Sequence, residues 1–182
     1  MGTAGVVLAG GAGRRYGMPK ALVTHNGRLF VQHAADTLRA GGCDPLLVVL
    51  GAAADEVLTA APDLPPTVFN PDWATGMASS LRAGLAALAG TDATAAVILL
   101  VDMPGVTPEA VRRIRAHSSP DALVMGGYGP RRGHPVLLGR NHWAGVAASA
   151  TGDRGARDYL RSRDVQVIPV GDVADDTDID TK

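Results

Sequence analysis

The stretch AGVVLAGGAGRRYGMPK, residues Ala4–Lys20, joins a short apolar run to a glycine-rich segment that carries cations. Residues 4–8 are small or apolar, which is typical of a strand covered on both faces. Four glycines then lie within eight positions, interleaved with Arg14 and Arg15 and followed by Lys20. Glycines let the backbone turn its N–H groups toward anionic oxygens, and the three cations can neutralise them. The stretch therefore predicts a strand that ends in a phosphate-binding loop.

The rest of the chain alternates apolar runs of strand length with segments of helical period. The expected strands are Ala4–Leu8, Leu46–Leu50, Thr67–Phe69, Ala96–Val101, Ala122–Met125, Pro135–Leu138 and Val165–Val170. The expected helices are Leu29–Ala40, Met77–Leu88 and one that begins at Pro108 after the N-cap Thr107. Asn26-Gly27 predicts a tight turn between two short strands.

This alternation predicts an α/β fold, a mostly parallel twisted sheet with helices on both faces. With no internal repeat and no linker, residues 1–182 are expected to form a single domain. Ligands of such sheets bind beyond the carboxyl ends of the strands. Because the run VILLV ends at Asp102, we expect this carboxylate and the glycine loop to project from the same edge.

Composition excludes several classes of protein. The net charge of −1 argues against nucleic-acid binding, which needs a broad basic surface. Cys43 is the only cysteine, so no internal disulfide can form, and a reducing compartment is favoured. The longest apolar run, Ala95–Val101, is too short to span a bilayer, and no basic residue precedes the first apolar run. We expect a cytoplasmic protein with no nucleic-acid or membrane partner.

The glycine loop does not match two well-known nucleotide-binding patterns. A Walker loop requires Gly-Lys-Ser/Thr, whereas Gly17 is followed by Met-Pro-Lys. A dinucleotide fingerprint requires G-x-G-x-x-G, and Gly11, Gly13 and Gly17 are spaced one residue too widely. This spacing disfavours a dinucleotide-dependent oxidoreductase. A plain glycine-rich turn with solvated arginines is the remaining alternative.

Six motifs in order resemble those of the nucleotidyltransferases related to the molybdenum cofactor cytidylyl- and guanylyltransferases. They are LAGGAGRRYGMPKAL, NPDWATGMASSL (Asn70–Leu81), VDMPGV (Val101–Val106), GHPVLL (Gly133–Leu138), GDRGAR (Gly152–Arg157) and DIDT (Asp178–Thr181). The resemblance covers nearly the whole chain and implies a Rossmann-like nucleotidyltransferase fold. GMPKAL and GMASSL are most similar to the cytidylyl branch, whereas Gly10 resembles the guanylyl branch, where the cytidylyl branch has alanine.

The resemblance implies that an acceptor phosphate attacks the α-phosphorus of a nucleoside triphosphate and expels pyrophosphate. A phosphate monoester is already anionic at pH 7, so it needs no general base. Arg15 and Lys20 are then the expected catalytic cations, with Arg14 as a further contact for the triphosphate. Asp102 is the third expected catalytic residue, as a carboxylate that suits Mg²⁺, although it could simply end a strand. The resemblance supplies a second metal carboxylate, Asp180 in preference to Asp178, from a tail that could equally be a solvated acidic run.

The remaining candidate residues follow from the same resemblance. Besides Arg14, the expected nucleotide-binding residues are Leu8, Ala9, Gly10, Gly11, Gly13, Asn70, Gly76 and Ser80. The expected acceptor-binding residues are Arg131, Arg132 and His134, which Arg154 and Arg157 could extend. Taken alone, the serines are typical of helix caps and His134 of a turn.

These observations favour cytidylyl transfer from CTP to the molybdopterin cofactor, with guanylyl transfer from GTP as the alternative. Relatives with this loop also act on sugar phosphates, so another phosphate acceptor stays open. A non-catalytic nucleotide- or cofactor-binding chaperone is the alternative from another class, which Lys20 and Asp102 disfavour. The expected partners are the triphosphate, the molybdopterin-type acceptor, and transiently a molybdoenzyme or its chaperone.

Overall fold

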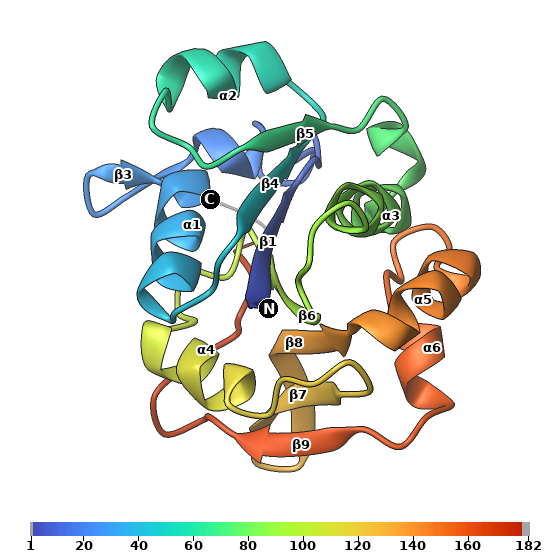
Figure 1. Ribbon diagram of the computed structural model, residues 1–182. Coiled ribbons are helices and arrows are strands. Elements are labelled where there is room, and N and C mark those ends of the chain that lie inside the picture. Colours follow the sequence, from blue (N-terminus) through green and yellow to red (C-terminus); the bar gives the residue numbers. More distant parts are fainter. Residues whose placement is uncertain (1, 180–182) are drawn as a thin grey trace.

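The computed structural model describes residues 2–179 of the 182-residue chain, and its centre is a seven-stranded sheet (Figure 1). The strands are β1 (Thr3–Ala9), β4 (Leu46–Leu50), β5 (Thr67–Phe69), β6 (Ala95–Leu100), β7 (Leu123–Tyr128), β8 (Arg131–Gly139) and β9 (Gln166–Pro169). Their order is β5-β4-β1-β6-β8-β7-β9. β8 runs antiparallel to β6 and β7, and the other neighbours pair in parallel. The expected mostly parallel α/β sheet is confirmed.

Helices cover both faces of this sheet. They are α1 (Phe30–Ala40), α2 (Ala54–Ala60), α3 (Met77–Leu88), α4 (Pro108–Arg115), α5 (Trp143–Ser149) and α6 (Arg157–Arg161). Short 3-10 turns form η1 (Lys20–Leu22), η2 (Trp73–Thr75) and η3 (Arg140–His142). Figure 1 shows α1 and α4 on one side of the sheet and α3, α5 and α6 on the other. Within residues 2–179, no helix is long and apolar enough to cross a membrane.

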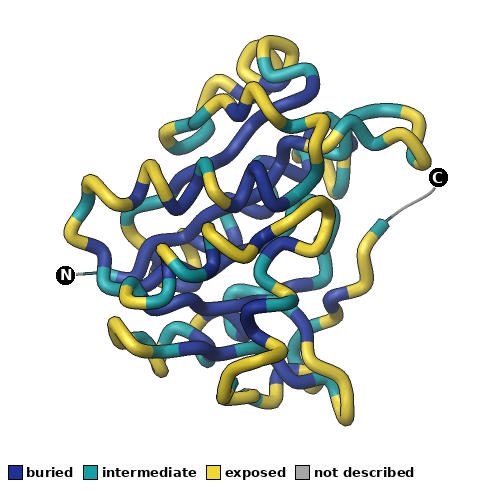
Figure 2. Tube along the Cα trace, turned by 90° about the vertical axis from the view of Figure 1, so that its right-hand side faces the viewer, coloured by how far each residue is buried: buried dark blue, intermediate teal, exposed yellow. Residues whose placement is uncertain are grey.

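Two apolar cores, one on each face, hold these layers together. Val31, Leu38 and Ile114 pack on one face with α1 and α4, and Leu81 and Leu85 of α3 pack on the other. β6 lies at the middle of the sheet, and its unbroken apolar run is buried, as expected for a strand covered twice. In Figure 2 the buried segments accordingly run through the interior, and the exposed segments lie outside them.

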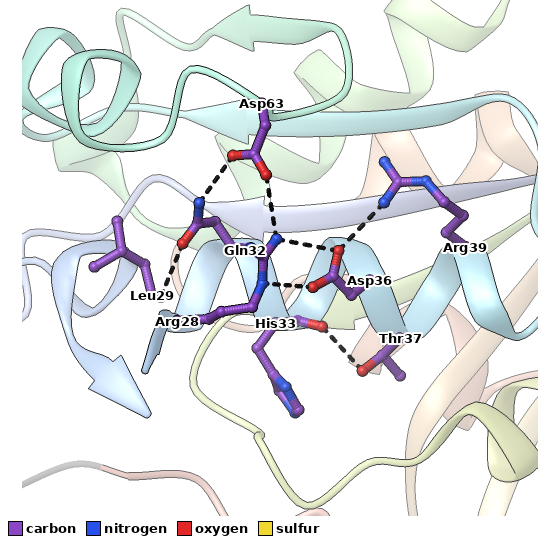
Figure 3. A network of polar contacts seen from close by, with 8 residues as sticks. All are labelled: Arg28, Leu29, Gln32, His33, Asp36, Thr37, Arg39 and Asp63. Carbon is purple, nitrogen blue, oxygen red and sulfur yellow. Dashed lines mark hydrogen bonds and ion pairs between the residues drawn. The ribbon is translucent and has the colours of Figure 1, made fainter. Parts of the chain in front are cut away.

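The predicted helix cap and the predicted tight turn both form. The hydroxyl of Thr107 accepts a hydrogen bond from the backbone N–H of Ala110 at 3.2 Å, so it caps α4 directly before Pro108. Asn26 and Gly27 both adopt positive φ and join the strands β2 (Thr24–His25) and β3 (Arg28–Leu29). Figure 3 shows how the next residues are tied: Arg28 reaches Asp36 and Asp63, and Gln32 also reaches Asp63. This surface network fixes the hairpin against the start of α1.

The described residues after β9, 170–179, return to the carboxyl edge of the sheet and form no helix or strand. Its backbone is bonded to the loop that follows β6, because the N–H of Asp175 donates to Gly105 O at 3.1 Å. Further along, the N–H of Ile179 donates to Asp102 O at 3.0 Å. The last described residues therefore lie directly beside Asp102.

Candidate active site

The ends of β1 and β6 meet at the carboxyl edge of the sheet. The two strands are parallel neighbours, and Val101 N–H donates to Leu8 O at 3.2 Å just where they end. β4 and β5 lie on one side of β1 and β6 lies on the other, so the strand order reverses at β1. Sheets of this kind bind ligands at such a reversal. A cavity of about 620 Å³ opens here, with the glycine loop, Ser80 and Asp102 in its wall. The predicted convergence of the glycine loop and Asp102 is confirmed.

The glycine loop turns tightly because Gly13 has no side chain. Gly13 has φ of 64°, and a Cβ there would overlap the carbonyl oxygen of Met18. Gly17 N–H also donates to Gly13 O at 2.8 Å, which closes the loop on itself. The loop therefore folds back from the end of β1 and delivers Lys20, at the start of η1, to the mouth of β6.

Lys20 and Asp102 form an ion pair inside this cavity. Lys20 Nζ lies 2.9 Å from Asp102 Oδ2, and the two side chains are only 15% and 17% exposed. The pair joins residues 82 positions apart in the chain, so only the folded sheet brings them together. Arg14 and Arg15 both line the same cavity, which adds two cations to its wall.

The same cavity is also lined by most of the residues predicted to meet the nucleotide base. Gly76 and Ser80 line it, and so do Leu8, Gly10 and Gly11. A Cβ on Gly10 would lie 2.7 Å from Ser80 Oγ, so the space between them depends on glycine at position 10.

Two other predicted nucleotide-binding residues lie behind the surface of the cavity. Asn70 is buried and donates to Ser79 Oγ at 2.8 Å and to Ser80 Oγ at 3.0 Å. Asn70 therefore orients the serine hydroxyls from beneath. Ala9 is buried within β1.

A second cavity, of about 640 Å³, adjoins the first. Its lining includes the apolar residues Leu81, Ile98, Met125 and Leu138, together with His134 and the exposed Arg132. Leu8, Met77, Leu100, Asp153, Arg157 and Asp178 line both cavities. The side chains of Arg157 and Asp178 therefore stand where a ligand of one cavity would meet a ligand of the other.

Two of the predicted acceptor-binding residues differ from free cations that could meet a phosphate: one is already paired with a carboxylate, and the other is uncharged. Arg131 lines the second cavity but gives its guanidinium to the carboxylate of Asp176, at 2.8 and 3.2 Å. Burial lowers the pKa of His134 to about 4, and the nearby Asp176 and Asp102 offset this only in part. His134 is thus neutral at pH 7 and can offer a phosphate a hydrogen bond but no charge.

Sequence reasoning did not include Arg161, which also lines the second cavity. Its position four residues after Arg157 places both on one face of α6, and that spacing is the signal that could have found it. Together with Arg132 and Arg154, these side chains give the apolar cavity a cationic rim.

The acidic side chains at the site suit a divalent metal ion. Asp102 and Asp178 line the same cavity, and Asp180 lies outside the described residues. No group of three or more potential metal ligands occurs in the part of the chain that the structure describes. Two carboxylates beside a phosphate cradle nevertheless match Mg²⁺, which binds one or two carboxylates together with substrate phosphates. The donor set therefore fits such an ion.

Residues 5–167 match the model of the MobA-like NTP transferase domain. The chain belongs to this family. Membership confirms the resemblance inferred from the six motifs, and it agrees with a glycine loop and a carboxylate placed at one edge of a Rossmann-like sheet.

Proteins that resemble this chain over much of its length carry different names. The nicotine blue oxidoreductase of Paenarthrobacter nicotinovorans is 38% identical over 189 residues, which cover 97% of this chain and 91% of the relative. The probable molybdenum cofactor guanylyltransferase of Rhodopirellula baltica is 31% identical over 104 residues, 57% of this chain and 49% of its own length. This chain therefore spans about half of that second relative.

Among solved structures, Rv0371c from Mycobacterium tuberculosis H37Rv is similar over the full length. It superposes with a TM-score of 0.86 at 31% identity, covering 100% of this chain and 93% of its own. A manganese complex of the same protein gives a TM-score of 0.81 over 98% of this chain and 94% of its own.

Proposed function

We propose that this protein transfers a nucleotidyl group from CTP to a molybdopterin-type acceptor in the cytoplasm and releases pyrophosphate. The observation that carries the proposal is the Lys20–Asp102 pair in the wall of the glycine-loop cavity. A protein that only binds nucleotide could hold the triphosphate through the glycine loop and its arginines alone. An enzyme that expels pyrophosphate needs both a metal carboxylate and a cation for the leaving group.

In this mechanism the glycine loop and its cations hold the triphosphate while the acceptor phosphate attacks in line. The loop N–H groups face the phosphate oxygens, and Arg15 and Lys20 neutralise the charge that develops on pyrophosphate. The attacking phosphate carries about −1.5 to −2 charge at pH 7, so the neutral state of His134 is no obstacle. Asp102 and Asp178 would hold Mg²⁺, which supplies further charge neutralisation at the phosphates. Catalysis thus rests on positioning and charge.

The second cavity is the proposed acceptor site. Its apolar lining suits the flat ring system of a molybdopterin, and its arginine rim suits the terminal phosphate. The shared wall at Arg157 and Asp178 would bring this phosphate toward the α-phosphate of the nucleotide. A molybdoenzyme or its chaperone would then receive the product.

The direct test is pyrophosphate release with each of the four nucleoside triphosphates, in the presence of Mg²⁺ and purified molybdopterin cofactor. The proposal expects release with CTP that depends on both the acceptor and the metal. Tight triphosphate binding without release would instead indicate the chaperone function. Release with a sugar phosphate in place of molybdopterin would contradict the acceptor assignment.

Guanylyl transfer from GTP is a second candidate because Gly10 leaves space beside Ser80. Replacing Gly10 by alanine places a methyl group 2.7 Å from Ser80 Oγ and forces the hydroxyl away. We expect Gly10→Ala to raise the ratio of kcat/KM for CTP over GTP by about tenfold or more, since one methyl group in a pocket discriminates by that order. Pyrophosphate release at varied CTP and GTP measures the ratio. A ratio unchanged from the wild type would remove Gly10 from base selection.

Reduction of a coloured heterocycle is a further candidate function. It is suggested by the name of the Paenarthrobacter nicotinovorans relative, nicotine blue oxidoreductase. An apolar cavity beside a nucleotide cavity would also suit such a substrate and a dinucleotide. Incubation of the protein with nicotine blue and NADH or NADPH tests this directly. Bleaching of the dye that survives Asp102→Asn, with no pyrophosphate release from any triphosphate, would replace the transferase proposal.

Arg157 offers a test of the acceptor site. Its guanidinium lines both cavities, and a charge-assisted hydrogen bond to a phosphate is worth about 1.5–3 kcal/mol. We therefore expect Arg157→Ala to raise the KM for the acceptor by about tenfold to a hundredfold. Steady-state kinetics at varied molybdopterin measure this, with Arg39→Ala on α1 as the control that changes nothing (Figure 3). An unchanged acceptor KM would place the acceptor elsewhere.

A further inference from the structure

The chain after β9 forms a strap, residues 171–179, across the carboxyl edge of the sheet. Asp172 pairs with Arg113 of α4 at 2.7 Å, and Thr107 Oγ1 donates to Val173 O at 2.9 Å. The backbone bonds to Gly105 and Asp102 follow. In Figure 2 the strap leads to the C label and is mostly exposed or half-buried.

Asp176 is the buried exception within this strap. Its side chain is 5% exposed although it carries a charge, and Arg131 Nη2 and Nη1 donate to it at 2.8 and 3.2 Å. The backbone N–H of His134 donates to it at 3.3 Å. Gly133 leaves room for the carboxylate, because a Cβ there would overlap Asp176 Oδ2. A buried carboxylate held by three donors has one low-energy position, since any shift leaves a charge unpaired.

This contact links the acceptor-side hairpin of β7 and β8 to the metal carboxylates. Asp178 lies two residues beyond Asp176, and an extended chain spans about 3.3 Å per residue. The position of Asp176 therefore limits where the backbone of Asp178 can lie. Asp178 lines both cavities, and the next residue is bonded to Asp102 O. The strap is thus fixed on both sides of Asp178.

We propose that Asp176 is a positioning residue that fixes Asp178 in the site, and that Arg131 serves as its counterion and does not bind the acceptor. The inference rests on the metal role proposed above for Asp178. Residues that orient metal ligands typically change metal affinity by about 10–100-fold when removed. The pair should therefore control how tightly the protein holds a divalent ion.

The test is a titration with Mn²⁺ followed by electron paramagnetic resonance, with α,β-methylene-CTP present and absent. We expect Asp176→Ala, Arg131→Ala and Asp178→Asn each to weaken Mn²⁺ binding by about tenfold or more. The double variant should be no weaker than either single one, because both remove the same contact. Arg131→Lys keeps an ion pair and should retain most of the affinity.

Asp172→Ala is the matched control, since it removes a similar two-bond arginine pair from the exposed start of the same strap. It should bind Mn²⁺ as the wild type does. Thermal unfolding shows whether each variant is folded. If Asp176→Ala does not fold, Arg131→Ala tests the same contact by removing its exposed partner.

The two proposals fail in different ways. Wild-type Mn²⁺ affinity in both Arg131→Ala and Asp176→Ala, or in Asp178→Asn, overturns the positioning role and leaves nucleotidyl transfer untouched. An Arg131→Ala variant that changes only the KM for the acceptor overturns it as well. A wild-type protein that binds Mn²⁺ but releases no pyrophosphate overturns nucleotidyl transfer, while the effect of Asp176 on Mn²⁺ binding still stands.

Discussion

Asp102→Asn is expected to lower pyrophosphate release by about a thousandfold or more. The amide has the shape of the carboxylate, so the end of β6 and its bonds to the strap should be kept, while the negative charge is lost. Metal-ion catalysis contributes several kcal/mol at phosphate oxygens, and each 1.36 kcal/mol is about tenfold in rate. The measurement is kcat for pyrophosphate release at saturating triphosphate and acceptor, repeated over a range of Mg²⁺ concentrations.

The control for this substitution is Asp63→Asn, which makes the same chemical change in the surface network of Figure 3. Asp63 is exposed and bonds Arg28 and Gln32, so its loss should leave kcat unchanged. Turnover by Asp102→Asn at the wild-type rate would contradict the proposal that Asp102, at the end of β6, holds the metal ion. Partial recovery at high Mg²⁺ would support it, because a weakened site is refilled by mass action.

The sheet could be predicted from the sequence because each strand is a distinct apolar run. All seven expected strands form, and the unbroken run that ends at Asp102 is the middle strand of the sheet, where both faces are covered. Helices α2, α5 and α6 were not predicted, because they are only five to seven residues long. α2 buries a single apolar residue, Val57, so no helical period is visible in its sequence.

The residues of the site could be predicted from the sequence only where a motif with recognisable chemistry stands at the end of a strand. The glycine loop and Asp102 each end a strand, and parallel pairing of β1 with β6 must then bring them together. The state of Arg131 could not be predicted, because its partner Asp176 lies 45 residues away in an irregular segment. The contact between Asn70 and Ser80 could not be predicted either. In the sequence, an asparagine before a helix gives the same pattern whether its side chain binds a ligand or two serines.

Lys20 carries the second large effect. We expect Lys20→Met to lower kcat by about a hundredfold to a thousandfold, the cost of removing one group that stabilises transition-state charge. Methionine keeps an unbranched side chain of similar length but lacks the ammonium group, so it loses the charge and the hydrogen-bond donors together. Because the charge on pyrophosphate develops during the reaction, the KM for the triphosphate should change much less than kcat. Steady-state pyrophosphate release at varied triphosphate separates the two constants.

Lys20 could instead matter only as the counterion of Asp102, and Mg²⁺ dependence separates these roles. A metal ion held by Asp102 takes over the neutralisation of that carboxylate, so the loss in Lys20→Met would then disappear at saturating Mg²⁺. A lysine that meets the leaving pyrophosphate cannot be replaced in this way. We therefore expect the loss in kcat to persist at saturating Mg²⁺, and the Lys20→Met and Asp102→Asn double variant to be slower than either single one. Full recovery by Mg²⁺ would reduce Lys20 to a partner of Asp102.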